Sequence, residues 1–368
     1  MQQPITPTSD PQPEQQRIIM EPPSIAVTVV VPMRNEEHRI GPCLDSIKRN
    51  EFPTEQLEIL VVDGRSTDSS RAIVAERAAS FASIRLLDNP GKIVSAGLNI
   101  GLREARGRVI IIMGAHAEYS PTYIKTCLQE LEATNADAVG GVLQTLPGGH
   151  TLVARAVALM TQHPFGVGGS AFRTRRRSGY VDTVPYAAYR RPVFERVGLF
   201  NEKLVRNQDF EFNARVRRAG GKLFLSSEIE TTYYQVPDVK RLVMQAFNNG
   251  FWLAQMWFSS AASIRLRHAI PGAFVAVLLA SLLLFPLGFA FFVPGALALL
   301  LYGITVALTA GQIAQHEGGK FFLPLCALFF THHVAYGAGT LAGLIRRAVR
   351  PPYFQGLFEH RTSSNLQS

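Results

Sequence analysis

The sequence predicts an α/β domain with a mainly parallel sheet, followed by apolar helices that enter a membrane. Three short runs rich in Val and Ile each end abruptly in a polar cluster: Ile25–Val31, Leu57–Val62 and Arg108–Met113. Runs of this length and composition are typical of buried strands in parallel sheets. A longer stretch, between Arg267 and Glu317, contains no Asp, Glu, Lys or Arg. Such a stretch favours membrane insertion over a soluble helical hairpin, because soluble helices usually carry a polar face.

Four helical patterns alternate with the apolar runs, which favours a parallel sheet with helices on both faces. They cover Cys43–Arg49, Ser69–Ser80, Val94–Arg106 and Pro121–Glu132. Open sheets of this kind bind ligands at the carboxyl ends of their strands. Carboxylates, an imidazole and basic groups follow the runs, and this mixture suits a ligand that carries a diphosphate. The sequence therefore indicates a nucleotide-dependent enzyme.

The membrane region has room for about three hydrophobic segments. One span needs about 20 apolar residues. The stretch between Arg267 and Glu317 can therefore hold two segments, and the uncharged stretch between Lys320 and Arg346 can hold one. Three crossings from a cytoplasmic domain would place the basic cluster Arg346–Arg350 on the far side, against the positive-inside tendency. Either a short tail breaks that rule, or one segment is re-entrant.

Composition divides the chain into five parts. The first residues are rich in Pro and Gln and predict a disordered leader. Trp252 and Trp257 lie among Gln, Asn and Ser upstream of the membrane region, which is typical of amphipathic helices at a membrane surface. The expected parts are a leader (1–24), a nucleotide-binding domain (25–235), interfacial helices (236–267), the membrane region (268–346) and a tail (347–368).

The charge pattern indicates a membrane partner. The net charge is +9, and basic residues flank the apolar segments. This pattern favours basic residues on the cytoplasmic side of a membrane, next to anionic lipid headgroups. No motif interleaves the basic residues with base-stacking aromatics, so we expect no nucleic-acid partner. Cys43, Cys127 and Cys326 match no disulfide framework or zinc spacing.

Acidic residues follow the first two apolar runs. Asp63 ends the second run, where a carboxylate can accept hydrogen bonds from a base or ribose, and we interpret it as a ligand-binding residue. Asp68 is interpreted as a cap of the following helix. Glu37 is explained by the helix dipole. Glu36 has two open roles, as a helix cap or as part of the nucleotide site.

Three further positions are candidates for chemistry, each with a structural alternative. Lys92 follows Pro-Gly in a tight loop, where its ammonium group can meet a phosphate. His116 follows the third run and alternates with Glu118, so the pair can hold a divalent cation, or the imidazole packs internally. Asp209 is a first-turn acid of a helix or a general base that faces the cleft. His332 and His333 lie in the last apolar segment. We favour a helix-packing role for them over a role as a functional pair.

Taken together, these strings resemble family 2 glycosyltransferases, most of all the membrane-anchored bacterial exopolysaccharide branch of the succinoglycan type. The resemblance runs from Val27 to Gly221. It rests on VVVPMRNEE, VVDGRSTDSS, GLNIGLREARGRVIIIMGAHAEY, FGVGGSAFR, VDTVPYAAYRR and LVRNQDFEFNARVRRAGG. It implies a GT-A fold, in which a nucleotide-binding half joins an acceptor-binding half over one continuous sheet. It also implies a multi-pass protein of the cell inner membrane with a cytoplasmic catalytic domain.

The resemblance implies roles for individual residues. Asp63, with Pro32 and Glu36, would hold the nucleobase, and Lys92 would lie near the nucleotide. Asp209 matches the acidic residue that serves as catalytic base. The triplet from Gly114 to His116 occupies the metal-binding Asp-X-Asp slot, in which His116 can still bind Mg²⁺ or Mn²⁺. Because Gly114 replaces the first acid, either metal binding is weaker, Glu118 compensates, or the chain is catalytically impaired.

The expected reaction is direct displacement at the anomeric carbon of a nucleotide sugar, with inversion. The acceptor is expected to be a saccharide, most simply one linked to a lipid. A basic cluster could receive the acceptor's diphosphate or could be a solvated loop; it comprises Arg173, Arg175, Arg176 and Arg177. The Gln-X-X-Arg-Trp signature of processive synthases is missing after Gln245. Two competing functions stay open, a processive synthase and a catalytically impaired membrane partner of an assembly complex.

Overall fold

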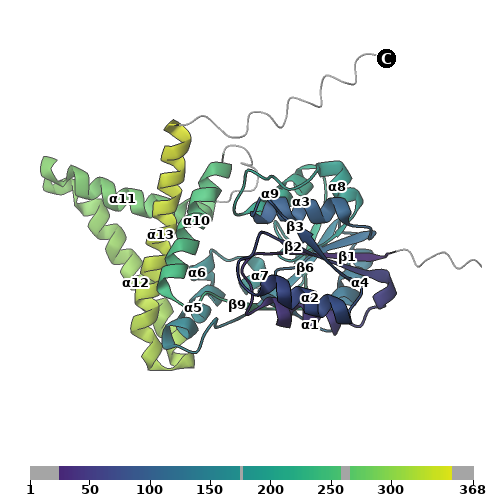
Figure 1. Cartoon of the computed structure of the whole chain (residues 1–368). Helices are drawn as coiled ribbons and strands as arrows, with labels where there is room; N and C mark the ends of the chain where they lie inside the picture. The colour runs from purple at the N-terminus through teal and green to yellow at the C-terminus, as the bar shows by residue number, and fades with distance from the viewer. Residues whose placement is uncertain (1–24, 175–176, 258–265, 350–368) are drawn as a thin grey trace, which may run out of the picture.

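The structure is a computed structural model that describes residues 25–174, 177–257 and 266–349. The predicted leader (1–24) and most of the predicted tail (347–368) lie outside these ranges. Figure 1 shows a domain built around one sheet and, beside it, a group of long helices formed by the C-terminal part of the chain.

The first half of the sheet is parallel, as the apolar runs predict. β1 (Val27–Met33) lies between β2 (Leu57–Asp63) and β4 (Val109–Ile112), and β2 also pairs with β3 (Ile84–Asp88). Consecutive side chains of a strand point to opposite faces, so Val29 joins the hydrophobic core on one face and Val30 the core on the other. Both faces of β1, β2 and β4 are largely buried, which explains why these three strands are mainly apolar.

The second half of the sheet is mixed. The strand order is β3-β2-β1-β4-β8-β6-β9-β5, with β7 paired to β9. β8 runs antiparallel to β4 and β6, β9 runs parallel to β6, and β5 and β7 run antiparallel to β9. Their bounds are Ala117–Tyr119 (β5), Ala138–Leu146 (β6), Gly179–Tyr180 (β7), Ala188–Arg190 (β8) and Leu223–Tyr234 (β9).

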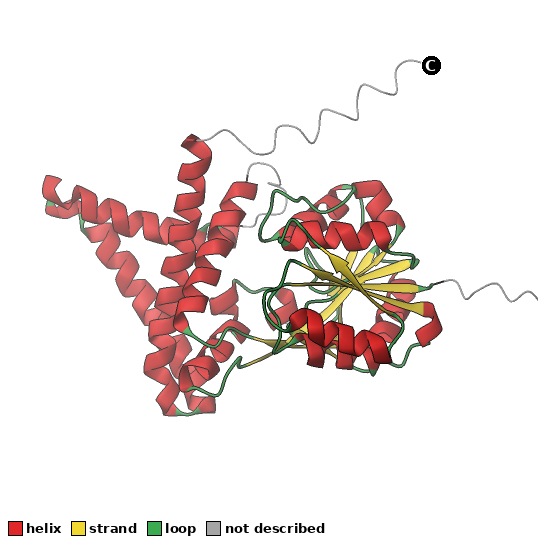
Figure 2. Ribbon diagram, viewed as in Figure 1, coloured by secondary structure: helices red, strands yellow, loops and turns green. Residues whose placement is uncertain are grey.

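Helices cover both faces of the sheet, which confirms the predicted fold class (Figure 2). One face carries α1 (Ile40–Lys48), α2 (Ser70–Ser80) and α4 (Tyr123–Thr134). The other face carries α3 (Val94–Glu104), α8 (Pro192–Val197) and α9 (Gln208–Arg218).

The remaining α-helices include three short ones after β6 and the four long ones of the C-terminal helical group. They are α5 (Leu152–Gln162), α6 (Pro164–Val167), α7 (Ala171–Thr174), α10 (Val239–Met256), α11 (Ile270–Leu284), α12 (Val293–Glu317) and α13 (Phe322–Val349). Three segments among the described residues are long and apolar enough to cross a membrane: Ile270–Leu287, Phe289–Glu317 and Gly319–Val349.

Helices α10 and α13 lie side by side and approach closely through glycines (Figure 1). A Cβ atom on Gly339 of α13 would lie 2.0 Å from the carbonyl oxygen of Phe247 in α10. A Cβ on Gly250 of α10 would lie 2.1 Å from the carbonyl oxygen of Tyr336 in α13. Small residues allow this approach between apolar helices, so backbone packs directly on backbone.

This contact predicts the effect of adding one methyl group. In Gly339→Ala the helices must separate, which should lower the free energy of unfolding by about 1–3 kcal/mol, the usual range for overpacking. Gly303→Ala in α12 is the matched control, because nothing lies within 4 Å of the added Cβ. Thermal unfolding in detergent measures both, and equal midpoints for the two variants would contradict the packing described here.

Candidate active site

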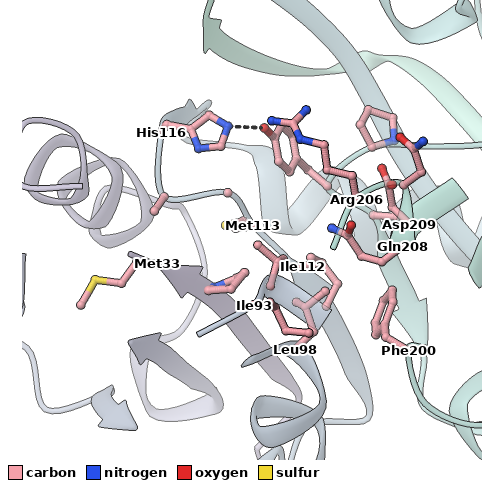
Figure 3. Close-up of a pocket in the computed structure, with 18 of the residues that line it drawn as sticks. Met33, Ile93, Leu98, Ile112, Met113, His116, Phe200, Arg206, Gln208 and Asp209 are labelled. Carbon is pink, nitrogen blue, oxygen red and sulfur yellow. Dashed lines mark hydrogen bonds between the residues drawn. The ribbon is translucent and has the colours of Figure 1, made fainter. Parts of the chain in front are cut away.

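A cavity of about 500 Å³ lies at the carboxyl ends of β1 and β4. Figure 3 shows His116 on one side of this first cavity, and Asp209 with Arg206 on the other. The sheet brings together residues that are far apart in the sequence. Six predicted site residues line the cavity: Pro32, Glu36, Lys92, His116, Arg173 and Asp209.

His116 and Glu36 lie next to each other on the wall of the first cavity. Its Nδ1 atom lies 3.5 Å from Glu36 Oε1, and its Nε2 atom lies 3.4 Å from the hydroxyl of Tyr186. The His116 side chain is 42% exposed and therefore accessible to a ligand. Glu118, which alternates with His116 in the sequence, instead accepts a hydrogen bond of 2.9 Å from the Tyr234 hydroxyl. The carboxylate beside the imidazole is thus Glu36, supplied by the neighbouring strand end.

Gly114 has no room for the acid that the family pattern expects. A Cβ atom at this position would lie 2.6 Å from Cε1 of Tyr186 and 3.0 Å from its hydroxyl oxygen. The backbone of Gly114 is also held in place, because its N–H donates a hydrogen bond of 2.6 Å to the hydroxyl of Tyr119. The ring of Tyr186 therefore occupies the space that a longer side chain would need.

The described residues provide two donors for a metal ion rather than a complete protein-built site. No group of three His, Cys, Asp or Glu side chains gathers to hold a metal within the described part of the chain. The pair of His116 and Glu36 offers one imidazole and one carboxylate on the cavity wall. Mg²⁺ commonly binds one or two carboxylates together with substrate phosphates, and Mn²⁺ also accepts oxygen ligands. The pair therefore fits a cation that binds with a diphosphate.

Asp209 lies in the first turn of α9, and its exposed surface opens into the cavity. The pKa of its carboxyl group is raised because the surrounding protein limits its hydration; the backbone N–H of Phe210 and the charge of Arg206 act in the opposite direction. Arg206 Nη1 donates a hydrogen bond of 3.0 Å to Asn249 Oδ1 on α10, which ties this turn to the helical group. Glu211 is buried and paired with Arg215 at 2.8 Å, so it is a structural acid.

Asp63 is fully buried at the end of β2 and does not line the cavity. Its carboxylate accepts hydrogen bonds from the hydroxyl of Ser66 at 2.5 Å and from Arg71 Nη1 at 2.7 Å. Arg71 also reaches Asp88 at 2.7 Å. The chain thus fixes the Asp63 oxygens with its own donors, and the predicted role in nucleobase binding stays a prediction.

The other predicted residues are placed as follows. Lys92 is exposed at the cavity rim in a left-handed conformation, with φ of 62°. Arg173 lies deeper, with its guanidinium group 4.8 Å from the Tyr233 ring centre and 3.1 Å from Thr145 Oγ1. Arg177 is exposed and lines neither cavity. Arg175 and Arg176 lie outside the described residues.

A second cavity, of about 540 Å³, extends from Asp209 to the apolar helices. It shares five lining residues with the first cavity: Phe172, Arg173, Asn207, Asp209 and Gln245. Its far wall is formed by Ile270 and Phe274 of α11 and Tyr302 of α12. Arg267, which pairs with Asp182 at 3.5 Å, lies beside these apolar groups. The second cavity is therefore amphipathic, with its polar end at Asp209.

The His pair of α13 belongs to this second cavity. His333 Nδ1 lies 2.9 Å from the hydroxyl of Tyr302, and its Nε2 lies 3.0 Å from the carbonyl oxygen of Phe165. The carbonyl can only accept, so Nε2 carries the proton and Nδ1 accepts from Tyr302. His333 thus joins α6, α12 and α13. His332 also lines the cavity, and its buried Nδ1 has no hydrogen-bond partner among the described residues.

Sequence reasoning missed several residues of both cavities. Tyr233 and Asn249 lie in none of the strings that carry the resemblance, and each reaches its cavity through long-range packing. Tyr186 lies in the string VDTVPYAAYRR, but that string indicated no role for it. Gln245 was singled out only for a missing signature, yet it lines both cavities.

Comparison with known proteins places these features in context. Residues 28–198 match the model of Glycosyl transferase family 2. A dolichyl N-acetyl-alpha-D-glucosaminyl phosphate 3-beta-D-2,3-diacetamido-2,3-dideoxy-beta-D-glucuronosyltransferase of Methanococcus voltae is 26% identical over 87% of this chain and 97% of its own. The succinoglycan biosynthesis protein ExoA of Rhizobium meliloti (strain 1021) is 28% identical over 86% of this chain and 94% of its own.

A solved structure shares the fold. Mannosyltransferase PcManGT from Pyrobaculum calidifontis, in complex with GDP-Man and Mn²⁺, matches with a TM-score of 0.56 at 18% identity. The match covers 84% of this chain and 86% of that chain. At this identity the likeness concerns the fold alone, and it confirms the predicted GT-A architecture.

The contact between positions 114 and 186 predicts a coupled pair of substitutions. Gly114→Ala should lower the free energy of unfolding by about 1–3 kcal/mol, because the methyl group meets the Tyr186 ring. In a Tyr186→Leu background the same change should cost less, since the atoms that it meets are gone. Thermal unfolding of the four chains measures the coupling. Gly179→Ala, with nothing within 4 Å of its Cβ, is the control; purely additive costs would rule out the contact.

Proposed function

Because this chain belongs to glycosyl transferase family 2, we propose that it transfers one sugar from a nucleotide-sugar donor to a lipid-linked acceptor, with inversion at the anomeric carbon. One observation carries the proposal: Asp209 lies where the first cavity meets the second cavity, which leads to the apolar helices. A base at that junction can reach a donor on one side and an acceptor on the other.

The first cavity suits the donor. Its rim carries Lys92, whose ammonium group can meet a phosphate as a point charge. Pro32 lies near the end of β1 and Glu36 follows that strand, close to the end of β2 that bears Asp63. We assign the nucleotide to this end, with the sugar directed toward Asp209.

His116 and Glu36 would hold the divalent cation implied by the family, with the donor diphosphate completing its ligands. A Mg²⁺ or Mn²⁺ ion bound there supplies positive charge beside the departing diphosphate. Arg173, at the junction of the cavities, adds a fixed positive charge.

Asp209 acts as the general base. It accepts the proton of the acceptor hydroxyl while that oxygen attacks the anomeric carbon, and the bond from that carbon to the diphosphate oxygen breaks. A single displacement of this kind inverts the configuration. The raised pKa of Asp209 makes it a better proton acceptor than an ordinary aspartate, provided that it is ionised at the working pH.

The second cavity suits an acceptor that has a polar head and an apolar tail. Arg173 and Arg267 offer positive charge to a phosphate, while Ile270 and Phe274 offer apolar contact to a lipid chain. A free sugar would use only the polar end. The amphipathic lining therefore favours a saccharide linked to a lipid through phosphate.

Replacing the base should separate binding from turnover. Asp209→Asn should lower kcat by about 10²–10⁴-fold, the usual contribution of a general base, while donor binding is retained. Transfer of radiolabelled sugar into the lipid phase measures turnover, and thermal shift with the nucleotide sugar measures binding. Glu195→Gln, which changes an exposed acid of α8, is the control for this substitution. Intact turnover in Asp209→Asn would remove Asp209 from this role.

The pH dependence of the unmodified chain gives a second test. The value of kcat/KM should fall as the pH drops through the raised pKa of Asp209, because the carboxylate that accepts the proton is lost.

Removing the positive charge of Arg267 tests the proposed acceptor site. Arg267→Gln should raise KM for a polyprenyl-phosphate-linked acceptor about tenfold or more, because one charge-assisted hydrogen bond is lost. Donor affinity should be unchanged, since Arg267 does not line the first cavity. Arg241→Gln, an exposed arginine of α10, removes the same charge away from both cavities. Unchanged acceptor KM in Arg267→Gln would refute the assignment.

The same assays separate the two competing functions. Long products from the purified chain would indicate a processive synthase. Absence of donor binding in the unmodified chain, with and without Mn²⁺, would indicate a catalytically impaired partner of an assembly complex.

A further inference from the structure

The C-terminal helices leave open how the chain enters the bilayer. Length and composition allow three crossings. The arrangement of the helices, the chemistry of the turn between α11 and α12, and the positions of the cations point elsewhere. We propose that α11 and α12 form a re-entrant hairpin that dips into the leaflet beside the catalytic domain, and that α13 lies along the membrane surface without crossing.

The turn of the hairpin is apolar throughout. The segment from Phe285 to Gly295 reads FPLGFAFFVPG and has no polar side chain. Its large side chains are exposed, with Leu287 73% and Phe289 70% exposed. A turn that emerged into water on the far side would expose these groups at a cost of about 25 cal/mol per Å². The same groups are stabilised when lipid chains surround them.

The backbone of this turn is also adapted to a medium without water. Two 3₁₀ helices, Phe285–Leu287 and Phe289–Phe291, carry the chain around the turn. Within them Gly288 N–H donates to Phe285 O at 3.0 Å, and Phe292 N–H donates to Phe289 O at 3.0 Å. Backbone groups in hydrocarbon must be paired inside the protein.

Side chains near the turn follow the same rule. Ser281, the polar residue that precedes the turn in α11, accepts a hydrogen bond of 2.9 Å from Gly295 N–H of α12. Pro286 and Pro294 have no N–H group to satisfy. The hairpin therefore closes on itself without needing water at its tip.

Helix α10 stays beside the catalytic domain along its length. Only four residues separate its start from the end of β9. Toward its other end, Leu253 and Met256 pack with Leu204 of the catalytic domain. A helix held at both ends in this way lies on the catalytic domain rather than away from it.

Helix α13 packs alongside α10 and is likewise held at both ends. Directly before its first residue, the ring centre of Phe321 lies 5.3 Å from the guanidinium group of Arg155 in α5. At its end Arg347 Nη1 donates a hydrogen bond of 2.8 Å to Gln255 O of α10. A crossing helix would carry one end about 30 Å away, through the hydrocarbon core. Figure 1 shows α11 and α12 on the side of α13 that faces away from the catalytic domain.

The charges agree with this arrangement. Arg267 precedes the hairpin, Lys320 follows it, and Arg346 and Arg347 end α13. With a re-entrant hairpin all of these cations lie in the same headgroup layer, which satisfies the positive-inside tendency. Three crossings would place Arg346 and Arg347 on the opposite side.

Cysteine labelling in intact cells and in inverted membrane vesicles tests the proposal. Single cysteines are placed at the hairpin tip (Leu287→Cys), at the end of α13 (Ala348→Cys) and, as a reference, at an exposed site of the catalytic domain (Ala82→Cys). The background carries Cys326→Ala, and the buried Cys43 and Cys127 are retained. A membrane-impermeant maleimide is the probe, and thermal unfolding checks that each variant folds.

We expect labelling at position 348 only on the side that labels position 82, and labelling at position 287 only after detergent is added. Labelling at position 287 from the side opposite position 82 would show that the hairpin crosses. Labelling there from the same side without detergent would show that the tip is not inserted. Labelling at position 348 from the opposite side would show that α13 crosses. Each of these last three results overturns the proposal and leaves the proposed reaction untouched.

Discussion

Helices α10 and α13 approach until the carbonyl oxygens of one helix touch the glycines of the other. This packing fixes α10, and α10 in turn carries Gln245 and Asn249 to the two cavities. Asn249 holds Arg206 by one hydrogen bond and Asn207 by another. These two residues directly precede α9, so the first turn that bears Asp209 is held by the helical group. The geometry of the proposed base therefore depends on an apolar contact outside the sheet.

The parallel half of the fold could be predicted from local sequence. Val and Ile runs mark β1, β2 and β4, because both faces of these strands are buried. β3 escaped prediction because Ile84–Asp88 mixes charged and apolar residues at the sheet edge. The mixed half was out of reach, since β8 has only three residues and β6 pairs with the distant β9. Pairings of that kind are decided by tertiary packing, which short patterns do not record.

The same limit explains the site. Sequence reasoning selected six residues that line the first cavity. Four of them lie at or just after the ends of parallel strands, which meet at one edge of the sheet, whereas Arg173 and Asp209 come from α7 and α9. It paired His116 with Glu118, two positions away, whereas the structure pairs His116 with Glu36 from another strand end. Alternation along an extended chain places neighbours on one face only while the strand continues, and His116 precedes β5 in a turn. His333 was interpreted as a packing residue; its two hydrogen bonds, to different helices, were not visible in the sequence.

The ring of Tyr186 has a consequence for how this chain relates to others. It fills the space that a side chain at position 114 would occupy, and its hydroxyl approaches His116. A lineage that regained an acid at position 114 would first need a smaller group at position 186. The two positions are thus expected to covary, so that glycine accompanies tyrosine and aspartate accompanies a short residue. A motif search registers position 114 alone, whereas the structure couples that position to Tyr186.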